Sequence, residues 1–132
     1  MACDLAEEAA HIVYRVTHCL LCLNAYLSSA GLVLIAPHRH LHSLADLSAD
    51  TAHELIDTAQ RAEVALRQVY RPGGLNMGLN LGEAAGAGIA DHIHLHVLPR
   101  WIGDTNFMTV TGETRVLPET LDVTWARLRP VF

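Results

Sequence analysis

Hydrophobic and polar positions along the chain follow two periods, and these predict the secondary structure segment by segment. Five short segments, apolar or alternating and ended by polar or turn-forming residues, are typical of β-strands. The run 32–36 is apolar at every position and ends at Pro37, which suits a central strand covered on both faces. The predicted strands are 12–16, 19–24, 32–36, 75–81 and 92–98.

The segment 48–70 instead carries apolar side chains at a spacing of three or four residues, which predicts an α-helix with one apolar face. Ser48 or Thr51 can cap the start of this helix, and Pro72-Gly73-Gly74 ends it. A shorter helix is predicted over 118–128. The apolar face of the long helix comprises Leu55, Ala59, Ala62, Leu66 and Val69.

Strands on both sides of one long helix predict the α+β class, with a mainly antiparallel sheet of about five strands and a short C-terminal helix in a single domain over 1–132. Gly78, inside a predicted strand, indicates a close approach of the backbone. Ile56, Val64 and Ala65 lie off the apolar face of the long helix. We therefore expect some of these three side chains to meet a partner.

The composition narrows the function classes. Hydrophobic residues make up 51% and charged residues 17% of the chain, which is typical of a globular protein. The formal charge of −5 argues against a general nucleic-acid surface. All nine basic residues are arginine, which excludes a Schiff-base lysine and a P-loop lysine. No apolar run is long enough to span a membrane, and the acidic residues within 1–8 do not fit a secretory signal, so we expect a cytoplasmic protein.

Cys19 and Cys22 form a CxxC pair, for which a zinc or redox role has to be weighed. The pair lies within a predicted strand, where residues three apart point to opposite faces and cannot chelate one ion together. The sequence has no second CxxC to complete a zinc site. We therefore interpret both cysteines as ordinary strand residues.

Three histidines, His92, His94 and His96, alternate with aliphatic residues and carry the strongest chemical signal. On a strand this alternation places the three imidazoles on one face and the aliphatic side chains on the other, toward the core. Three buried imidazoles without partners would be costly, so the imidazole face is predicted to be a wet surface or a polar cleft. The alternative without function is an exposed strand face that happens to be rich in histidine.

A metal site is a more specific alternative explanation of the three histidines. Alternate strand residues lie roughly 6.5–7 Å apart, so two neighbouring histidines could bind one zinc ion. His92 and His96 are about 13 Å apart and cannot share an ion without a further ligand from elsewhere. His38, His40 and His42 are the candidates for that ligand.

A nucleophilic histidine explains the pattern better. A neutral imidazole attacks phosphorus at neutral pH and forms a phosphoramidate that can pass its group onward. His94 has a neighbour on each side, one to fix its tautomer and one to protonate the leaving group. The glycine-rich segment 82–88 lies just upstream, and its backbone N–H groups could hold the phosphate charge.

With these residues in place, the sequence resembles the histidine triad (HIT) superfamily of nucleotide hydrolases and transferases. The resemblance covers most of the chain. A further likeness, over 99–107, 84–89 and 114–118, is to the branch that contains bacterial diadenosine tetraphosphate phosphorylases. The motifs that carry the resemblance are Leu23-Asn24, Pro37-His38-Arg39-His40, Asn80-Leu81-Gly82 and the triad over 92–98.

The resemblance implies a HIT-like fold, usually dimerised through the long helix and an edge strand. It implies that His94 is the nucleophile, that His96 assists at the phosphate and leaving group, and that His92 orients the pair. From the residues alone, Asn24 is equally well explained as the cap of a turn, and Trp101 either stacks on a base or packs in a dimer. The substrate-binding residues expected on this basis are Asn24, Asn80, Gly86, Gly88 and Trp101.

Two departures from the family pattern bear on function. Gly31-Leu32 stands where many relatives have Gly-His, and Cys3 stands alone where zinc-bearing relatives have paired cysteines. We therefore expect no structural metal and no cofactor. The function expected is cleavage of adenosine-type nucleotides, such as dinucleoside polyphosphates or phosphoramidates, through a nucleotidyl-histidine intermediate. The alternatives are a nucleotide-binding protein with little turnover, suggested by Leu32, and a zinc-dependent hydrolase.

Overall fold

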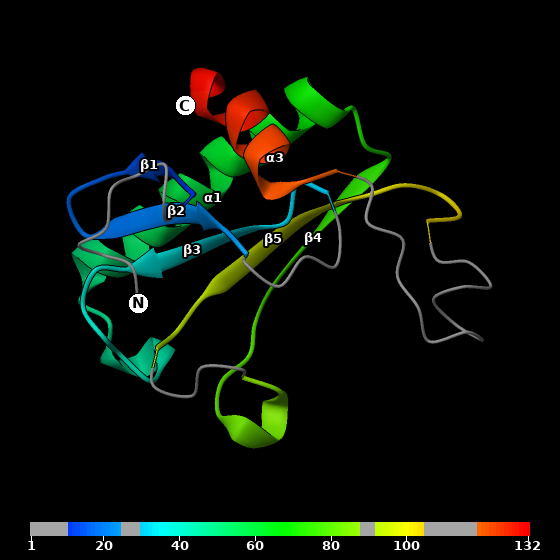
Figure 1. The fold of residues 1–132 in the computed structure, drawn as a ribbon. Helices are drawn as coiled ribbons and strands as arrows, with labels where there is room; N and C mark the ends of the chain where they lie inside the picture. The colour runs from blue at the N-terminus through cyan, green and yellow to red at the C-terminus, as the bar shows by residue number, and fades with distance from the viewer. Residues whose placement is uncertain (1–10, 25–29, 88–91, 105–118) are drawn as a thin grey trace.

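Five strands form one antiparallel sheet in the order β1-β2-β3-β5-β4, so β1 and β4 are its edge strands (Figure 1). The computed structural model describes residues 11–24, 30–87, 92–104 and 119–132. It confirms the predicted α+β class, with one long helix and a short C-terminal helix. The strands and α-helices are β1 (Ile12–Arg15), β2 (Cys19–Leu23), β3 (Val33–Pro37), α1 (Ala49–Tyr70), β4 (Gly74–Leu79), β5 (Leu95–Arg100) and α3 (Leu121–Leu128).

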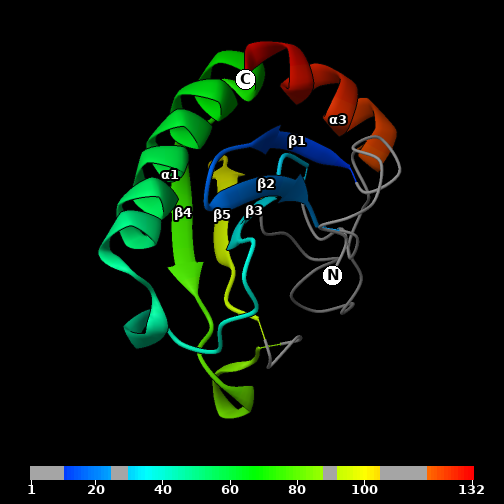
Figure 2. The same ribbon diagram turned by 90° about the vertical axis from the view of Figure 1, so that its left-hand side faces the viewer.

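Both helices lie on the same side of the sheet and arch over it (Figure 2). The hydrophobic core fills the space between them, because alternate residues of the strands point toward α1 and α3. Among the described residues, no helix combines the length and the apolar character that a membrane span needs. The buried cluster comprises Val13, Cys19, Leu21, Leu23, Val33, Ile35, Leu55, Ala59, Ala62, Leu66, Leu95, Val97 and Leu128.

The long helix α1 begins and ends close to the predicted positions. The hydroxyl of Ser48 accepts a hydrogen bond from the backbone N–H of Thr51 at 3.1 Å, which is the predicted N-cap. At the other end Arg71 adopts the left-handed conformation, with φ 47°, and the helix stops before Pro72.

The faces of α1 differ from the prediction at one position. Ile56 and Val64 are exposed, as expected of residues off the apolar face. Ala65, expected on the same side, is buried instead. It follows Ala62 by three residues, so it belongs to a packed stripe that is wider than the one read from the sequence.

The strand predicted over 92–98 starts late in the structure, at the first residue of β5, and continues two residues further. Residues 92–94 run beside the segment that follows β3, where the backbone N–H of Ile93 donates to the carbonyl of Leu41 at 2.8 Å. The first two histidines of the row are therefore held by a loop ahead of the regular ladder. The other predicted strands agree with the structure to within two residues.

The prediction for Gly78 is wrong. A Cβ atom built on this residue would meet no heavy atom within 4 Å, so no backbone in the described part of the chain approaches it closely. Gly78 lies on the edge strand β4, opposite His96 of β5. The space into which a side chain of residue 78 would point is therefore open.

The two cysteines of the CxxC pair point to opposite faces of β2, as predicted. Cys19 is in the core under α1, whereas Cys22 is half-buried on the other face. Burial, reinforced by the carboxylate of Glu54, raises the pKa of the Cys19 thiol to about 12. The thiol therefore stays protonated and unreactive at neutral pH.

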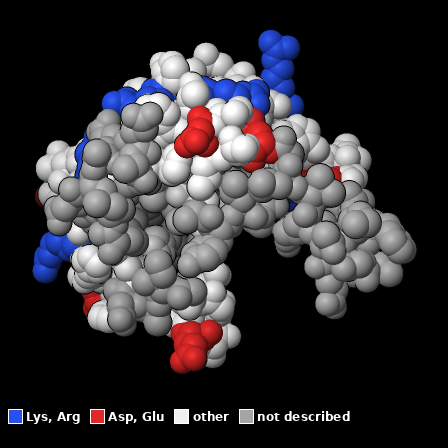
Figure 3. Space-filling model, in the orientation of Figure 1, with Lys and Arg blue, Asp and Glu red and all other residues white. Residues whose placement is uncertain are grey.

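Charged side chains are unevenly spread over the face in Figure 3. Most basic side chains lie along the upper edge, where Figure 1 places α1 and α3, and acidic side chains lie just beneath and at the bottom. No continuous basic stripe crosses the described part of this face.

A cluster of polar side chains ties α3 to the end of α1. The carboxylate of Glu119 accepts hydrogen bonds from the hydroxyl of Tyr70, the hydroxyl of Thr124 at 2.9 Å and the guanidinium of Arg127 at 3.0 Å. Arg127 also donates to the carbonyl of Val69 at 3.1 Å. Burial by itself would raise the pKa of Glu119, but the hydrogen bonds from these three partners outweigh it and lower the pKa.

We expect Glu119→Ala to lower the free energy of unfolding by about 2–3 kcal/mol, because three donors lose a charged acceptor whose side chain is only 11% exposed. Urea unfolding followed by circular dichroism measures this loss. Glu63→Ala is the matched control, since Glu63 forms only an exposed pair with Arg67 on α1, and should cost at most about 0.5 kcal/mol. Equal losses in the two variants would contradict a stabilising role for the cluster.

Candidate active site

Four imidazole rings lie in one row at the start of β5. The ring centroids of His92 and His94 are 5.2 Å apart, and those of His94 and His96 are 6.4 Å apart. His40, from the segment after β3, adds a fourth ring 4.6 Å from that of His92. The row occupies the sheet face opposite the helices, because Leu95 and Val97 point into the core.

His92 is the best-anchored ring of the row. Its Nε2–H donates to the carbonyl of Pro37 at 2.8 Å, which fixes the tautomer because a carbonyl oxygen only accepts. Its Nδ1 is buried, and the described part of the structure offers it no hydrogen-bond partner. Burial lowers the pKa of His92, so the ring stays neutral.

The burial of His92 corrects the prediction of a wet imidazole face. The side chain is only 3% exposed, whereas His94 and His96 are half-buried. The prediction was wrong for His92 because Pro37 supplies a hydrogen-bond acceptor and His40 covers the ring, and neither contact can be read from the local alternation.

The middle ring, His94, is neutral at ordinary pH. Burial, reinforced by His92 and His96 on either side, lowers its pKa to about 4. Burial also lowers the pKa of His96. A neutral ring presents an unprotonated nitrogen, so the geometry and the protonation state both suit nucleophilic attack by His94.

The glycine-rich segment forms a short turn upstream of the histidines. A 3₁₀ turn spans Glu83–Ala85, and Gly82 and Gly86 on either side of it have positive φ values of 85° and 88°. The side-chain amide of Asn80, just before the segment, donates to the carbonyl of Gly86 at 3.4 Å and so links the start of the turn to its end. Gly88, the other predicted glycine of this loop, lies outside the described residues.

The remaining predicted contacts lie farther from His94. Asn24 directly follows β2, two strands away from β5. Trp101 follows the far end of β5 and makes an edge contact with Tyr70, at 6.4 Å between ring centroids. Leu32, at the position of the missing histidine, is buried. The roles predicted for Asn24 and Trp101 stay predictions.

His40 is the residue of the row whose place sequence reasoning missed. The alternation of His38, His40 and His42 was a signal, but it suggested only a further metal ligand. In the structure Nε2 of His38 donates to the carbonyl of Val16 at 2.8 Å, which turns this side chain toward β1. Within the described ranges no group of three or more histidine, cysteine or acidic side chains is arranged to hold a metal ion.

Comparisons with known proteins agree with this geometry. The HIT domain family matches residues 6–101. An AP-4-A phosphorylase of Mycobacterium tuberculosis is 38% identical over 131 residues, which cover 94% of this chain and 67% of that protein. An Arabidopsis thaliana bis(5'-adenosyl)-triphosphatase/adenylylsulfatase is 35% identical over 72 residues, covering 54% and 39% of the two chains. The crystal structure of a Zn-bound histidine triad protein from Mycobacterium smegmatis superposes with a TM-score of 0.75 at 29% identity, covering 92% of this chain and 83% of that one.

We expect the ring protons of His94 to titrate with a midpoint near pH 4, well below the ordinary histidine value of 6.5. Histidine NMR signals, assigned by comparison with His94→Gln and followed from roughly pH 8 to roughly pH 3, about one unit below the expected midpoint, measure this. Because the folded-state pKa is lowered, the ring also takes up protons more readily when unfolded. The free energy of unfolding should therefore fall as the pH drops from 6.5 toward 4. A midpoint near 6.5 would contradict the effect of burial on this ring.

Proposed function

Because the chain belongs to the HIT domain family, we propose that it is an enzyme that cleaves phosphoanhydride or phosphoramidate bonds of adenosine-type nucleotides through His94. Two of the relatives described above carry names of enzymes that act on adenosine polyphosphates. The row of rings, in which His94 lies between His92 and His96, is the observation that supports this proposal most directly.

The first step is attack by a ring nitrogen of His94 on the phosphorus next to the adenosine. A nitrogen–phosphorus bond forms, and the phosphorus–oxygen or phosphorus–nitrogen bond to the leaving group breaks. The lowered pKa of about 4 keeps the attacking ring neutral without a separate base. The product of this step is a nucleotidyl-histidine and a free leaving group.

The neighbouring rings then have distinct tasks. His96 contacts the phosphate and supplies a proton to the leaving group. Burial lowers the pKa of His96, so the anionic substrate has to raise it again before this ring can act as an acid. His92, fixed by Pro37, orients the row. In the second step water or phosphate attacks the same phosphorus and releases His94.

The binding contacts are proposed on the family resemblance. Asn24 holds the two ribose hydroxyls, and the segment 82–88 with Asn80 holds phosphate oxygens. Trp101 stacks on a base or packs against a second subunit. The proposed partner is a small nucleotide rather than a nucleic acid, in keeping with the formal charge of −5, and the proposed compartment is the cytoplasm.

A nucleotide-binding protein with little turnover is the second candidate, and Leu32 favours it. An apolar, buried side chain stands where many family members have a histidine, so one polar contact to the site is absent. Turnover measured on adenosine substrates decides between the two candidates.

We expect His94→Ala to lower turnover of diadenosine tetraphosphate at least about a thousandfold while nucleotide binding stays measurable, because covalent catalysis is lost and the binding contacts remain. His53→Ala is the matched control, since His53 is an exposed histidine on α1. Assays with and without chelator, beside elemental analysis for zinc, test the metal-dependent alternative. Near wild-type turnover in His94→Ala would contradict the mechanism.

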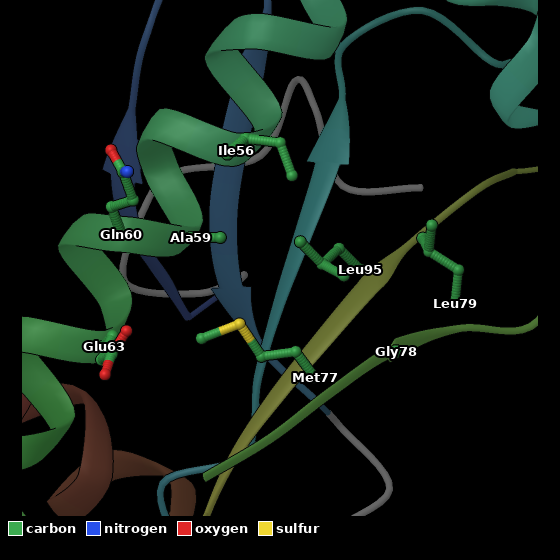
Figure 4. Close-up of a pocket in the computed structure, with 8 residues that line it drawn as sticks. All are labelled: Ile56, Ala59, Gln60, Glu63, Met77, Gly78, Leu79 and Leu95. Atoms are coloured by element: carbon green, nitrogen blue, oxygen red, sulfur yellow. The ribbon is translucent and has the colours of Figure 1, made fainter.

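We also propose that the chain forms a homodimer through α1 and β4. An open pocket of about 240 Å³ lies between these two elements, and Figure 4 shows Met77 and Leu95 pointing into it toward the helix. Ile56 and Met77 are large apolar side chains at this place, and they are 56% and 45% exposed. The outer side of β4 carries no strand partner among the described residues. An apolar pocket beside an open sheet edge is the kind of surface that a second copy covers.

We expect Met77→Glu to shift the protein from dimer to monomer at micromolar concentration in sedimentation equilibrium, because a carboxylate would be buried in the apolar interface. Val123→Glu is the control, since Val123 is exposed to a similar extent, 46%, on α3. A wild-type protein that sediments as a monomer would contradict the proposed dimer.

A further inference from the structure

Gly78 is a glycine that the fold itself does not require. It lies inside β4, its φ is outside the left-handed region, and a Cβ atom there would meet no heavy atom of the described residues within 4 Å. A glycine in a strand is less favourable than alanine, because it loses more conformational freedom on folding. Since neither the backbone conformation nor packing explains this glycine, the open space beside it is the feature to explain.

The open space lies on the imidazole face of the sheet. Gly78 pairs with His96 in the register of β4 and β5, so a side chain at position 78 would point to the same side as the imidazole. Its neighbours Met77 and Leu79 pair with Val97 and Leu95, whose side chains lie in the core, so they point toward α1 and leave the gap open.

The other side of His96 is filled. Leu34 of β3 pairs with His96, and Cys22 of β2 pairs with Leu34, so these two half-buried side chains continue the row across the sheet. Asn24, the proposed ribose contact, follows two residues after Cys22. On the β3 side, toward the proposed nucleoside, His96 has neighbouring side chains. On the β4 side, the space beside His96 is open.

We propose that Gly78 determines specificity, because its gap admits the part of the substrate that leaves the phosphorus. This inference rests on the proposed function, in which the nucleoside lies toward β2 and the leaving group lies at His96. The leaving group of a substrate bound across the row then extends over β4, where a side chain at position 78 would block it. The site is therefore built for a bulky leaving group, a nucleoside polyphosphate, and not only for a small amine.

The experiment compares two substrates with the same adenylyl group and different leaving groups. Diadenosine tetraphosphate releases a nucleoside polyphosphate, whereas adenosine 5′-phosphoramidate releases ammonia. The readout is the ratio of kcat/KM for the first substrate to kcat/KM for the second. Gly78→Val fills the gap, and since valine favours strands and its Cβ atom meets no described heavy atom within 4 Å, the variant should fold.

The matched control is Gly74→Val. Gly74 lies on the same face of the same strand, opposite Arg100, and a Cβ atom there also meets nothing within 4 Å. It stands four residues from Gly78, roughly 13 Å along the strand. Thermal melts and sedimentation of both variants check that fold and oligomeric state are kept.

We expect the ratio to fall about tenfold or more in Gly78→Val, as for a pocket that loses the room for a substrate group. It should stay within about twofold of wild type in Gly74→Val, which is too distant to contact the site. An unchanged ratio in a folded Gly78→Val, or an equal fall in both variants, overturns the inference while leaving the proposed function intact. A wild-type protein that cleaves neither substrate overturns the proposed function and this inference with it.

Discussion

The alternation of side chains along β5 is the constraint on which the rest of the structure depends. Leu95 and Val97 enter the core beneath α1, so His96 between them has to emerge on the opposite face, where the ring of His94, just before the strand, lies beside it. The core thus fixes the direction of the imidazole row, because a slip of one residue would bury imidazoles among leucines and expose the core. The free energy gained by burying the aliphatic side chains is also what holds the imidazoles in a line.

The alternation alone does not set the environment of the row. The end of β3 and the segment after it lie beside the row: they accept hydrogen bonds from the ring of His92 and the backbone N–H of Ile93, and the ring of His40 packs against that of His92. Burial, reinforced by the rings of His92 and His96 on either side, keeps His94 neutral. The environment of the row therefore depends on a contact made across more than fifty residues of sequence, between His92 and Pro37.

The local alternation of side chains and the contacts from distant residues together explain what the sequence could predict. The strands, the long helix and the common face of His92, His94 and His96 follow from local periodicity, which is set by neighbouring residues. The burial of His92 does not follow, because its cover comes from the distant Pro37 and His40. Gly78 was misread for the same reason: a strand glycine signals some close approach, but only the register with His96 shows that open space lies beside it.

The sheet also has a consequence for how this protein can change over generations. The helix-facing side chains, such as Leu95, carry the stability, whereas Cys22, Leu34 and Gly78 line the other face without entering the core cluster. Selection can therefore alter the layer on the imidazole face one position at a time, with little penalty to folding. A single sheet thus separates the positions that carry folding from those that can vary, so paralogues can diverge on one face while the scaffold stays unaltered.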